Sequence, residues 1–255
     1  MIKGLLIDIS GTIHIESKPI VGAVAAINHL RASKVPFRFA TNTTQVSSRR
    51  LVDKLNKLGF NTTREEIFTS LSACRDVIES QALRPLLLLE NEALEEFDGI
   101  DTSNPNAVVI GLAPSQMNYD QLNKAFRLVH QGAPFYAIHK GRYMAVADGE
   151  LSLGPGGFVQ AIEYATGVSA TVIGKPSRDF FLAALRQIGM EDRPQEVAMV
   201  GDDVQSDLGG GAVQLGMQRC LVSTGKYRPG DEDGHKVMVF GSIVDVVNTV
   251  LSDAQ

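Results

Sequence analysis

The chain has 255 residues, of which 44% are hydrophobic and 21% charged, so it is long enough to bury one sizeable core or a core with a smaller second unit. Its net charge of -5 comes without a long basic run, which argues against nucleic acid or an anionic membrane surface as the main partner. Its two cysteines lack the spacing of a metal or dithiol motif, and no export signal or membrane-length apolar run is found, so we expect a cytoplasmic protein.

The first elements form a strand, helix, strand unit. The apolar run 4–7 predicts a buried strand, and Asp8 follows it directly. Apolar residues at helical spacing predict a helix over 20–34, and a second strand over 37–40 runs into Thr41, Asn42 and Thr43. A helical crossover between two strands implies that the strands are parallel.

Residues 47–58 predict a helix that ends at Gly59, and residues 65–80 predict a further helix that starts near Ser70 or Ser72. The pattern then changes. The block 80–170 predicts three strands and two helices of its own, over 85–89, 107–111, 134–138, 119–130 and 157–165. None of its strands ends in a carboxylate as the first strand does, so we interpret this block as an insertion of one small domain's size.

The last third returns to the first pattern. A strand over 171–174 is expected to run into Lys175, followed by a helix over 178–188. The strand 197–200 runs into Gly201, Asp202 and Asp203, with a helix through Leu215, a strand over 218–222 and a last strand and helix over 237–251. The fold class is therefore α/β, with a doubly wound, Rossmann-like parallel sheet over 1–79 and 171–255 and an inserted α/β cap domain over 80–170.

Polar residues at the ends of parallel strands meet at one edge of a sheet, which is where α/β proteins place their chemistry. Asp8 and Asp202 would repel one another there unless a cation lay between them, and their oxygen ligands suit Mg²⁺. An oxygen of Asp8 is then the expected nucleophile toward phosphorus. Thr41 and Asn42 are expected to donate hydrogen bonds to the phosphate, and Lys175 to supply positive charge.

Four segments together carry a family resemblance: Asp8 to Thr12, Thr41-Asn42, Lys175-Pro176, and Gly201 through Asp207. They resemble the four motifs of the haloacid dehalogenase-like hydrolase superfamily, and the insertion resembles its NagD-like group with a large α/β cap. The resemblance implies an Mg²⁺-dependent phosphatase for small phosphorylated substrates and a homodimer formed through the cap.

The resemblance also implies roles by matched position. Asp8 is the nucleophile and a metal ligand, Ser10 a ligand through its backbone carbonyl, and Asp202 the third protein ligand. Thr41, Asn42, Thr43 and Lys175 are counted as the phosphate-binding residues. Asp203 and Asp207 are expected to support the outer shell of the metal.

One position departs from the superfamily. Most of its phosphatases carry a second aspartate two residues after the nucleophile, which protonates the leaving group, and this chain has Ser10 there. A general acid worth roughly 10²- to 10⁴-fold is then missing. We expect good leaving groups, such as those of pyrophosphate, phosphoramidates and aryl phosphates, to suffer least, and the aspartyl phosphate to persist.

Two other functions fit parts of the pattern. Hydrolysis of a carbon–halogen bond also uses an aspartate nucleophile, but it needs no metal, so the pair Asp8 and Asp202 disfavours it. A phospho-accepting or metabolite-sensing module also combines acids, a hydroxyl and a lysine on a parallel sheet. Such modules need no cap, and catalytic phosphate release would distinguish an enzyme from them.

Overall fold

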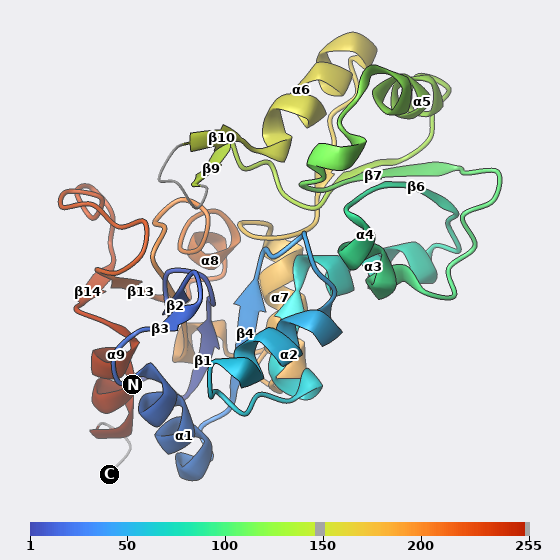
Figure 1. The fold of residues 1–255 in the computed structure, drawn as a ribbon. Coiled ribbons are helices and arrows are strands. Elements are labelled where there is room, and N and C mark those ends of the chain that lie inside the picture. The colour runs from blue at the N-terminus through green and yellow to red at the C-terminus, as the bar shows by residue number, and fades with distance from the viewer. Residues whose placement is uncertain (146–150, 253–255) are drawn as a thin grey trace. The chain divides into compact units, whose positions relative to one another are not determined.

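The computed structural model describes residues 1–145 and 151–252, and the contacts within the chain divide it into two compact units. The first unit comprises Met1–Thr41, Val52–Phe68 and Lys175–Gln255, and the second comprises Asn42–Leu51 and Thr69–Gly174. Figure 1 shows the elements of both units along the chain.

The strands are β1 (Gly4–Ile7), β2 (His14–Ile15), β3 (Lys18–Pro19), β4 (Phe37–Thr41), β5 (Ile67–Thr69), β6 (Pro85–Leu88), β7 (Ala107–Ile110), β8 (Phe135–Ala137), β9 (Tyr143–Ala145), β10 (Leu151–Leu153), β11 (Thr171–Val172), β12 (Val197–Gly201), β13 (Gln218–Val222) and β14 (Met238–Phe240). The α-helices are α1 (Ala23–Ser33), α2 (Ser48–Lys57), α3 (Ser70–Ser80), α4 (Asn91–Leu94), α5 (Tyr119–His130), α6 (Pro155–Thr166), α7 (Arg178–Gln187), α8 (Gly211–Gln214) and α9 (Ile243–Ser252). Short 3₁₀ turns are η1 (Arg64–Glu66), η2 (Glu95–Phe97), η3 (Pro114–Gln116) and η4 (Pro194–Glu196).

A six-stranded sheet has the order β14-β13-β12-β1-β4-β5, and the pairs from β14 to β4 are parallel. The chain builds this sheet outward from β1 in two directions, first through β4 and β5 and later through β12, β13 and β14. Helix α1 packs beside α9, and α7 packs beside α8 and β4. The predicted α/β fold with a doubly wound parallel sheet is confirmed.

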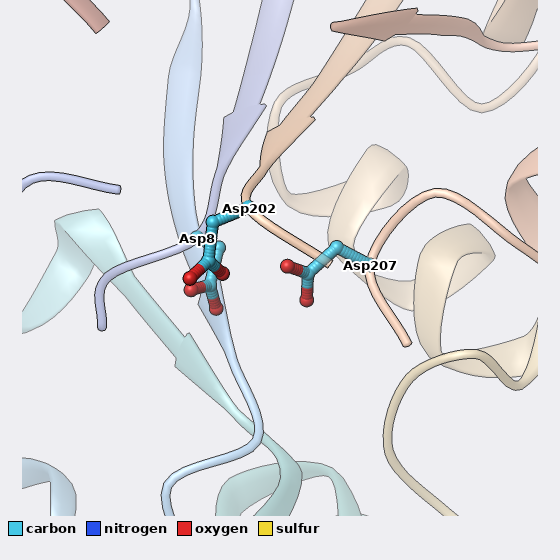
Figure 2. A group of neighbouring side chains, drawn as sticks. All are labelled: Asp8, Asp202 and Asp207. Carbon is cyan, nitrogen blue, oxygen red and sulfur yellow. The ribbon is translucent and has the colours of Figure 1, made fainter. Parts of the chain in front are cut away.

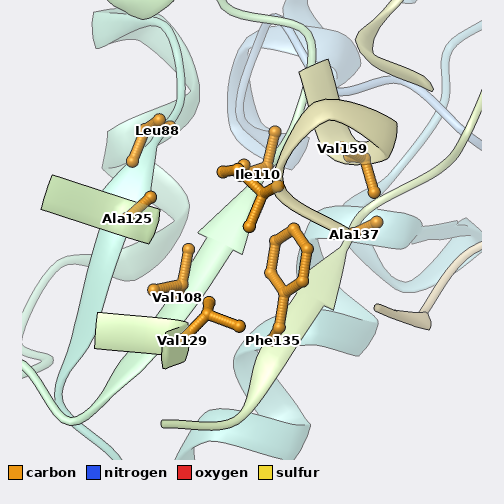
Figure 3. Packing of buried hydrophobic residues seen from close by; sticks show 9 residues of the cluster. Leu88, Val108, Ile110, Ala125, Val129, Phe135, Ala137 and Val159 are labelled. Atoms are coloured by element: carbon orange, nitrogen blue, oxygen red, sulfur yellow. The ribbon is translucent and has the colours of Figure 1, made fainter. Parts of the chain in front are cut away.

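The second unit has a parallel sheet of its own, in the order β11-β8-β7-β6, and an antiparallel pair of β9 and β10. Side chains from this sheet and from α5 and α6 form one hydrophobic cluster (Figure 3), whose members are Leu88, Val108, Ile110, Ala125, Val129, Phe135, Ala137, Val159 and Ile162. Burial of this cluster supplies the apolar contact that a sheet and two helices need to stay folded.

The helix expected within 65–80 is α3, which follows β5 and starts at Ser70, one of the two expected starts. The Thr69 hydroxyl caps α3 by accepting from the backbone N–H of Ser72 at 2.9 Å. Two other sequence expectations about elements were wrong. After Asp203 a loop runs to Gly210, and only α8 is helical before Leu215.

The second correction concerns the strand before Lys175. Strand β11 pairs with β8 in the four-stranded sheet and is not a strand of the main sheet. The periodicity of a short apolar run predicts a strand but not its partner, so the sequence alone placed β11 in the wrong sheet. Within the described residues, none of the helices is both long enough and apolar enough to cross a membrane.

Candidate active site

The site begins where β1 and β12 end side by side. Ile7 pairs with Val200, and the backbone N–H of Asp8 donates to the carbonyl of Val200 at 2.8 Å, which extends the pairing one residue past β1. Asp202 follows β12 at the same edge. The chain leaves β1 toward β4 and leaves β12 toward β13, and α/β proteins place their ligands at such a reversal of direction, beyond the carboxyl ends of the strands.

Three buried carboxylates meet at this edge. Asp8, Asp202 and Asp207 each offer an oxygen, and these oxygens lie within 4.8 Å of one another (Figure 2). We call these three residues the acid cluster. Asp207 reaches it from the loop after β12, and Gly201 permits this approach because a Cβ at that position would collide with the Asp207 side chain.

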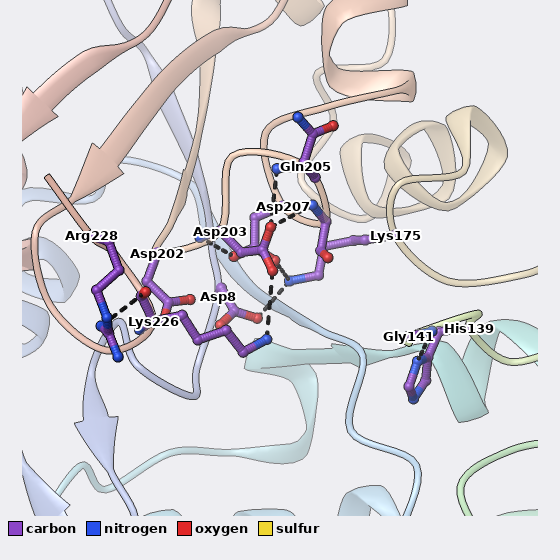
Figure 4. Close-up of polar contacts among 11 residues, drawn as sticks. Asp8, His139, Gly141, Lys175, Asp202, Asp203, Gln205, Asp207, Lys226 and Arg228 are labelled. Carbon is purple, nitrogen blue, oxygen red and sulfur yellow. Dashed lines mark hydrogen bonds and ion pairs between the residues drawn. The ribbon is translucent and has the colours of Figure 1, made fainter. Parts of the chain in front are cut away.

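Lys175 supplies the cation inside the acid cluster. Its ammonium donates to Asp8 Oδ1 at 2.5 Å and to Asp207 Oδ1 at 2.8 Å, and its side chain is only 1% exposed (Figure 4). Burial alone lowers the pKa of Lys175, but the carboxylates of Asp207 and Asp8 outweigh burial and raise the pKa above its usual value. Lys175 is therefore charged at neutral pH, and its contact with Asp8 agrees with the sequence expectation that the two residues meet.

The acid cluster still carries more negative than positive charge. Burial, followed by the charges of Asp207 and Asp8, raises the pKa of Asp202 to about 7. Burial also raises the pKa of Asp207 to about 6, with Lys175 opposing and Asp8 adding to the shift. Both shifts mean that ionising these carboxyls together is costly, because buried like charges disfavour the charged form.

The donor set of the acid cluster fits a hard divalent cation such as Mg²⁺, since it consists of carboxylate oxygens that repel one another without a cation. Both oxygens of Asp207 are engaged, Oδ1 by Lys175 and Oδ2 by the backbone N–H of Asp203 at 3.2 Å. Asp207 is thus better placed to orient Lys175 than to bind a metal directly. This leaves Asp8 and Asp202 as the carboxylates best suited to a metal.

Asp203 holds the loop that follows β12. Its Oδ1 accepts from the backbone N–H groups of Gln205 and Ser206 at 3.0 and 2.9 Å, an arrangement that closes a tight turn. Burial raises the pKa of Asp203, but these amides and the charge of Lys226 outweigh burial and lower the pKa below its usual value. Asp203 therefore stabilises the turn that carries Asp207 into the acid cluster.

A further segment contacts the site, and the sequence reasoning gave it no role. Thr224 Oγ1 donates to the carbonyl of Gly11 at 2.5 Å, and the backbone N–H of Lys226 donates to Asp202 Oδ2 at 2.7 Å. Gly225, with φ 61°, lies so close to Gly11 and Asp202 that a Cβ would collide with both. The signal was present in the sequence, because these residues follow β13 just as Asp202 follows β12.

The remaining predicted residues lie as follows. Ser10 is exposed in the turn after Asp8, and Thr41 is buried at the end of β4, next to β1. Asn42 and Thr43 belong to the second unit, where Asn42 Oδ1 lies against Gly174. The structure thus brings Asp8, Lys175, Asp202 and Asp207 together. The phosphate-binding role of Thr41, Asn42, Thr43 and Lys175 stays a prediction.

The sequence was compared with models of protein families. A model described as haloacid dehalogenase-like hydrolase matches residues 5–103, and one described as HAD-hydrolase-like matches residues 172–246. A bovine protein named haloacid dehalogenase-like hydrolase domain-containing protein 2 is 53% identical over 232 residues, which cover 91% of this chain and 88% of the relative. The chain belongs to the haloacid dehalogenase-like hydrolase family. The predicted resemblance is confirmed.

Other relatives are phosphatases by name. Human phospholysine phosphohistidine inorganic pyrophosphate phosphatase is 38% identical over 255 residues, covering 98% of this chain and 93% of the relative. The solved structure of a p-nitrophenyl phosphatase from Archaeoglobus fulgidus superposes with a TM-score of 0.87 at 25% identity, covering 97% of this chain and 98% of the other. The predicted enzyme class, a phosphatase of this family, agrees with these relatives.

Proposed function

We propose that this member of the family is an Mg²⁺-dependent phosphatase that hydrolyses small phosphorylated substrates through an aspartyl phosphate on Asp8. The observation that carries the proposal is the buried acid cluster with the Lys175 ammonium between Asp8 and Asp207, at the carboxyl ends of β1 and β12. A site of this kind can hold a divalent cation and a phosphate while presenting a carboxylate to phosphorus.

The residues divide the reaction among them. One carboxylate oxygen of Asp8 attacks phosphorus, the bond to the leaving group breaks, and water later releases phosphate from Asp8. Lys175, fixed by Asp207, offsets negative charge near Asp8, and Thr41, Asn42 and Thr43 donate hydrogen bonds to the phosphate. Mg²⁺, held by Asp8, Asp202 and the backbone carbonyl of Ser10, supplies further positive charge when it is bound.

In the proposed domain organisation, residues 80–170 form an inserted cap domain that selects the substrate. Helices α5 and α6 pack together in that segment, and Tyr119 and Tyr164 on them are largely exposed. An exposed pair of aromatic side chains supports the proposed homodimer through the cap, because such residues are enriched at protein interfaces.

Ser10 shapes the proposed substrate range. A serine hydroxyl does not protonate a leaving group near neutral pH, so substrates whose leaving groups need little protonation are expected to react best. Pyrophosphate, phosphoramidates and aryl phosphates belong to this class, whereas sugar phosphates do not. The name of the human relative, which acts on phospholysine, phosphohistidine and inorganic pyrophosphate, supports the same preference.

Phosphate release from pyrophosphate, p-nitrophenyl phosphate and a hexose phosphate tests the proposal, with Mg²⁺ or with a chelator. We expect the first two compounds to be hydrolysed in the presence of Mg²⁺ and the hexose phosphate to be slower. Asp8→Asn is expected to lower the rate by about 10⁴-fold or more, because it removes the nucleophile. Asp192→Asn, which removes an exposed carboxylate, is the matched control and should keep the rate.

Two results would contradict the proposal: phosphate release that survives Asp8→Asn, or phosphate release that is unaffected by the chelator.

A second candidate function is a phospho-accepting module with little turnover. Ser10 favours it, because a serine in place of the usual aspartate leaves no general base there to activate water for release of the phosphate from Asp8. Rapid mixing with p-nitrophenyl phosphate separates the two. A burst followed by slow turnover identifies a slow phosphatase, and a burst without turnover identifies the module.

A further inference from the structure

The segment Thr224–Lys226 is fixed beside the acid cluster by one side-chain and one backbone hydrogen bond. The Thr224 hydroxyl donates to the carbonyl of Gly11, and the backbone N–H of Lys226 donates to Asp202. Gly225 lies between them and allows the close approach of the segment. These contacts set where the Cα of Lys226 lies. The hydrogen bonds to Gly11 and Asp202 therefore fix the point from which the Lys226 side chain extends.

The Lys226 side chain, unlike its backbone, is open to solvent. It is 67% exposed, and its ammonium lies 3.6 Å from Asp203 Oδ2, near the outer limit of an ion pair. Because the pair is long and its lysine is exposed, it contributes little to stability, and an anionic ligand can replace Asp203 as the partner of Lys226. Partial burial lowers the pKa of Lys226, but the carboxylates, with Asp203 first, raise it, and the side chain is charged.

The two lysines therefore pair with different carboxylates of the same site. The Lys175 side chain is buried and pairs with Asp8 and Asp207, whereas the exposed Lys226 side chain pairs with Asp203. Figure 4 shows these ion pairs. A phosphate bound at Asp8 needs the positive charge of Lys175. A second phosphate, linked to the first and pointing to solvent, would need a cation at the position that Lys226 can reach.

We propose that Lys226 is a specificity-determining residue whose ammonium binds the leaving phosphate of pyrophosphate or of another diphosphate. The inference rests on the proposed function of Asp8. As an Asp8 oxygen bonds to the nearer phosphorus, the bridging P–O bond breaks and its electron pair leaves on the second phosphate. The charge of Lys226 stabilises that developing anion, which takes over part of the task of the acid that is missing at Ser10.

Water then attacks the phosphorus of the aspartyl phosphate, which regenerates the Asp8 carboxylate, releases the first phosphate and passes one proton to solvent. Monoesters such as p-nitrophenyl phosphate have no second phosphate for Lys226 to contact. Lys226 should thus favour diphosphates over aryl phosphates.

The ratio of kcat/KM for pyrophosphate to kcat/KM for p-nitrophenyl phosphate tests this role. We expect Lys226→Met to lower the ratio by about tenfold or more, the size of one lost charge-assisted contact. Lys226→Arg should restore the ratio to within about threefold of the natural chain, because it keeps the charge. Lys57→Met removes an exposed lysine at the end of α2 and should leave the ratio unchanged.

A binding measurement makes the test independent of turnover. Calorimetric titration of Asp8→Asn with inorganic pyrophosphate and with orthophosphate, both with Mg²⁺, should show that adding Lys226→Met weakens pyrophosphate about tenfold and orthophosphate far less. Equal losses for both anions, or no loss for either, would overturn the proposal. If the natural chain hydrolyses neither substrate, the proposed function fails, and the titration still decides the role of Lys226.

Discussion

At the residue scale, His14 shows what burial costs a titratable group. The side chain, in β2, is 2% exposed. Burial, and then the positive charge of Lys54, lower its pKa from 6.5 to about 4, against a small opposing effect of the Glu16 backbone. His14 is thus neutral in the folded protein at neutral pH. The unfolded chain binds a proton at this residue more readily than the folded one does.

The consequence is a loss of stability in acid. Below pH 6.5 the unfolded chain gains a proton at His14 that the folded chain gains only below about pH 4, so stability falls as the pH drops through this window. At pH 4.5 the cost is roughly 2 to 3 kcal/mol. Urea unfolding at pH 7.5 and pH 4.5 measures it, and His14→Leu should lose less stability between the two pH values than the natural chain does.

The matched control for this prediction is His29→Leu, which removes an exposed histidine of α1. It should lose as much stability in acid as the natural chain. If His14→Leu and His29→Leu behave alike, protonation of His14 is not the cause of the acid sensitivity.

At the scale of elements, acidic residues of the second unit hold the start of α2. The backbone N–H and the hydroxyl of Ser48 donate to the two oxygens of Glu96 at 2.6 and 2.9 Å, and the Ser47 hydroxyl donates to Glu95 at 3.1 Å. A carboxylate at this end satisfies free amides and opposes the positive end of the helix dipole. The first turn of α2 has no acidic residue of its own, so Glu96 supplies what the helix lacks.

We expect Glu96→Gln to lower the free energy of unfolding by about 1–3 kcal/mol, because a buried charged hydrogen bond is lost. A double-mutant cycle with Ser48→Ala should show a coupling of about 1 kcal/mol, since one of the two hydrogen bonds, that of the Ser48 hydroxyl, joins the two side chains. Glu79→Gln, which removes one member of an exposed pair with Arg75, should cost less than about 0.5 kcal/mol. A coupling near zero would mean that Glu96 stabilises the protein by other contacts.

The helices and strands also show how much of the fold can be predicted from the sequence. Periodicity found α5, β12 and β13, because their apolar patterns are long or fully buried. It missed β5, since three residues are too few for a period to show. It assigned β11 to the wrong sheet because pairing depends on contacts between segments far apart in the chain.

The same limit applies to the site. Asp8 and Asp202 were predictable from their places after β1 and β12 and from the family motifs. Lys175 was predictable from the motifs alone, because β11, the strand before it, belongs to the other sheet. The hydrogen bond from Lys175 to Asp207 was not predictable, because it depends on the path of a loop that was predicted to be helical. The approach of Gly225 to Gly11 joins residues more than 200 positions apart, and no local pattern reports such a contact.

At the scale of the whole molecule, the net charge of -5 understates the electrostatic cost of folding, because part of the negative charge is gathered in the buried acid cluster. Burial and mutual repulsion raise the pKa values of Asp202 and Asp207, so the folded state carries a cost that the unfolded chain does not. A divalent cation that binds only the folded state would offset this cost. Stability should then depend on the concentration of Mg²⁺.

We predict that Mg²⁺ raises the midpoint of thermal unfolding, measured by scanning calorimetry at pH 7.5. At a concentration 100 times its dissociation constant the stabilisation is about 2.7 kcal/mol, or roughly 5–10 °C for a chain of this size. Asp202→Asn should abolish most of the rise while Asp192→Asn keeps it, because only the former removes a proposed ligand. An equal rise in all three proteins would mean that Mg²⁺ acts elsewhere on the surface and that the acid cluster does not bind it.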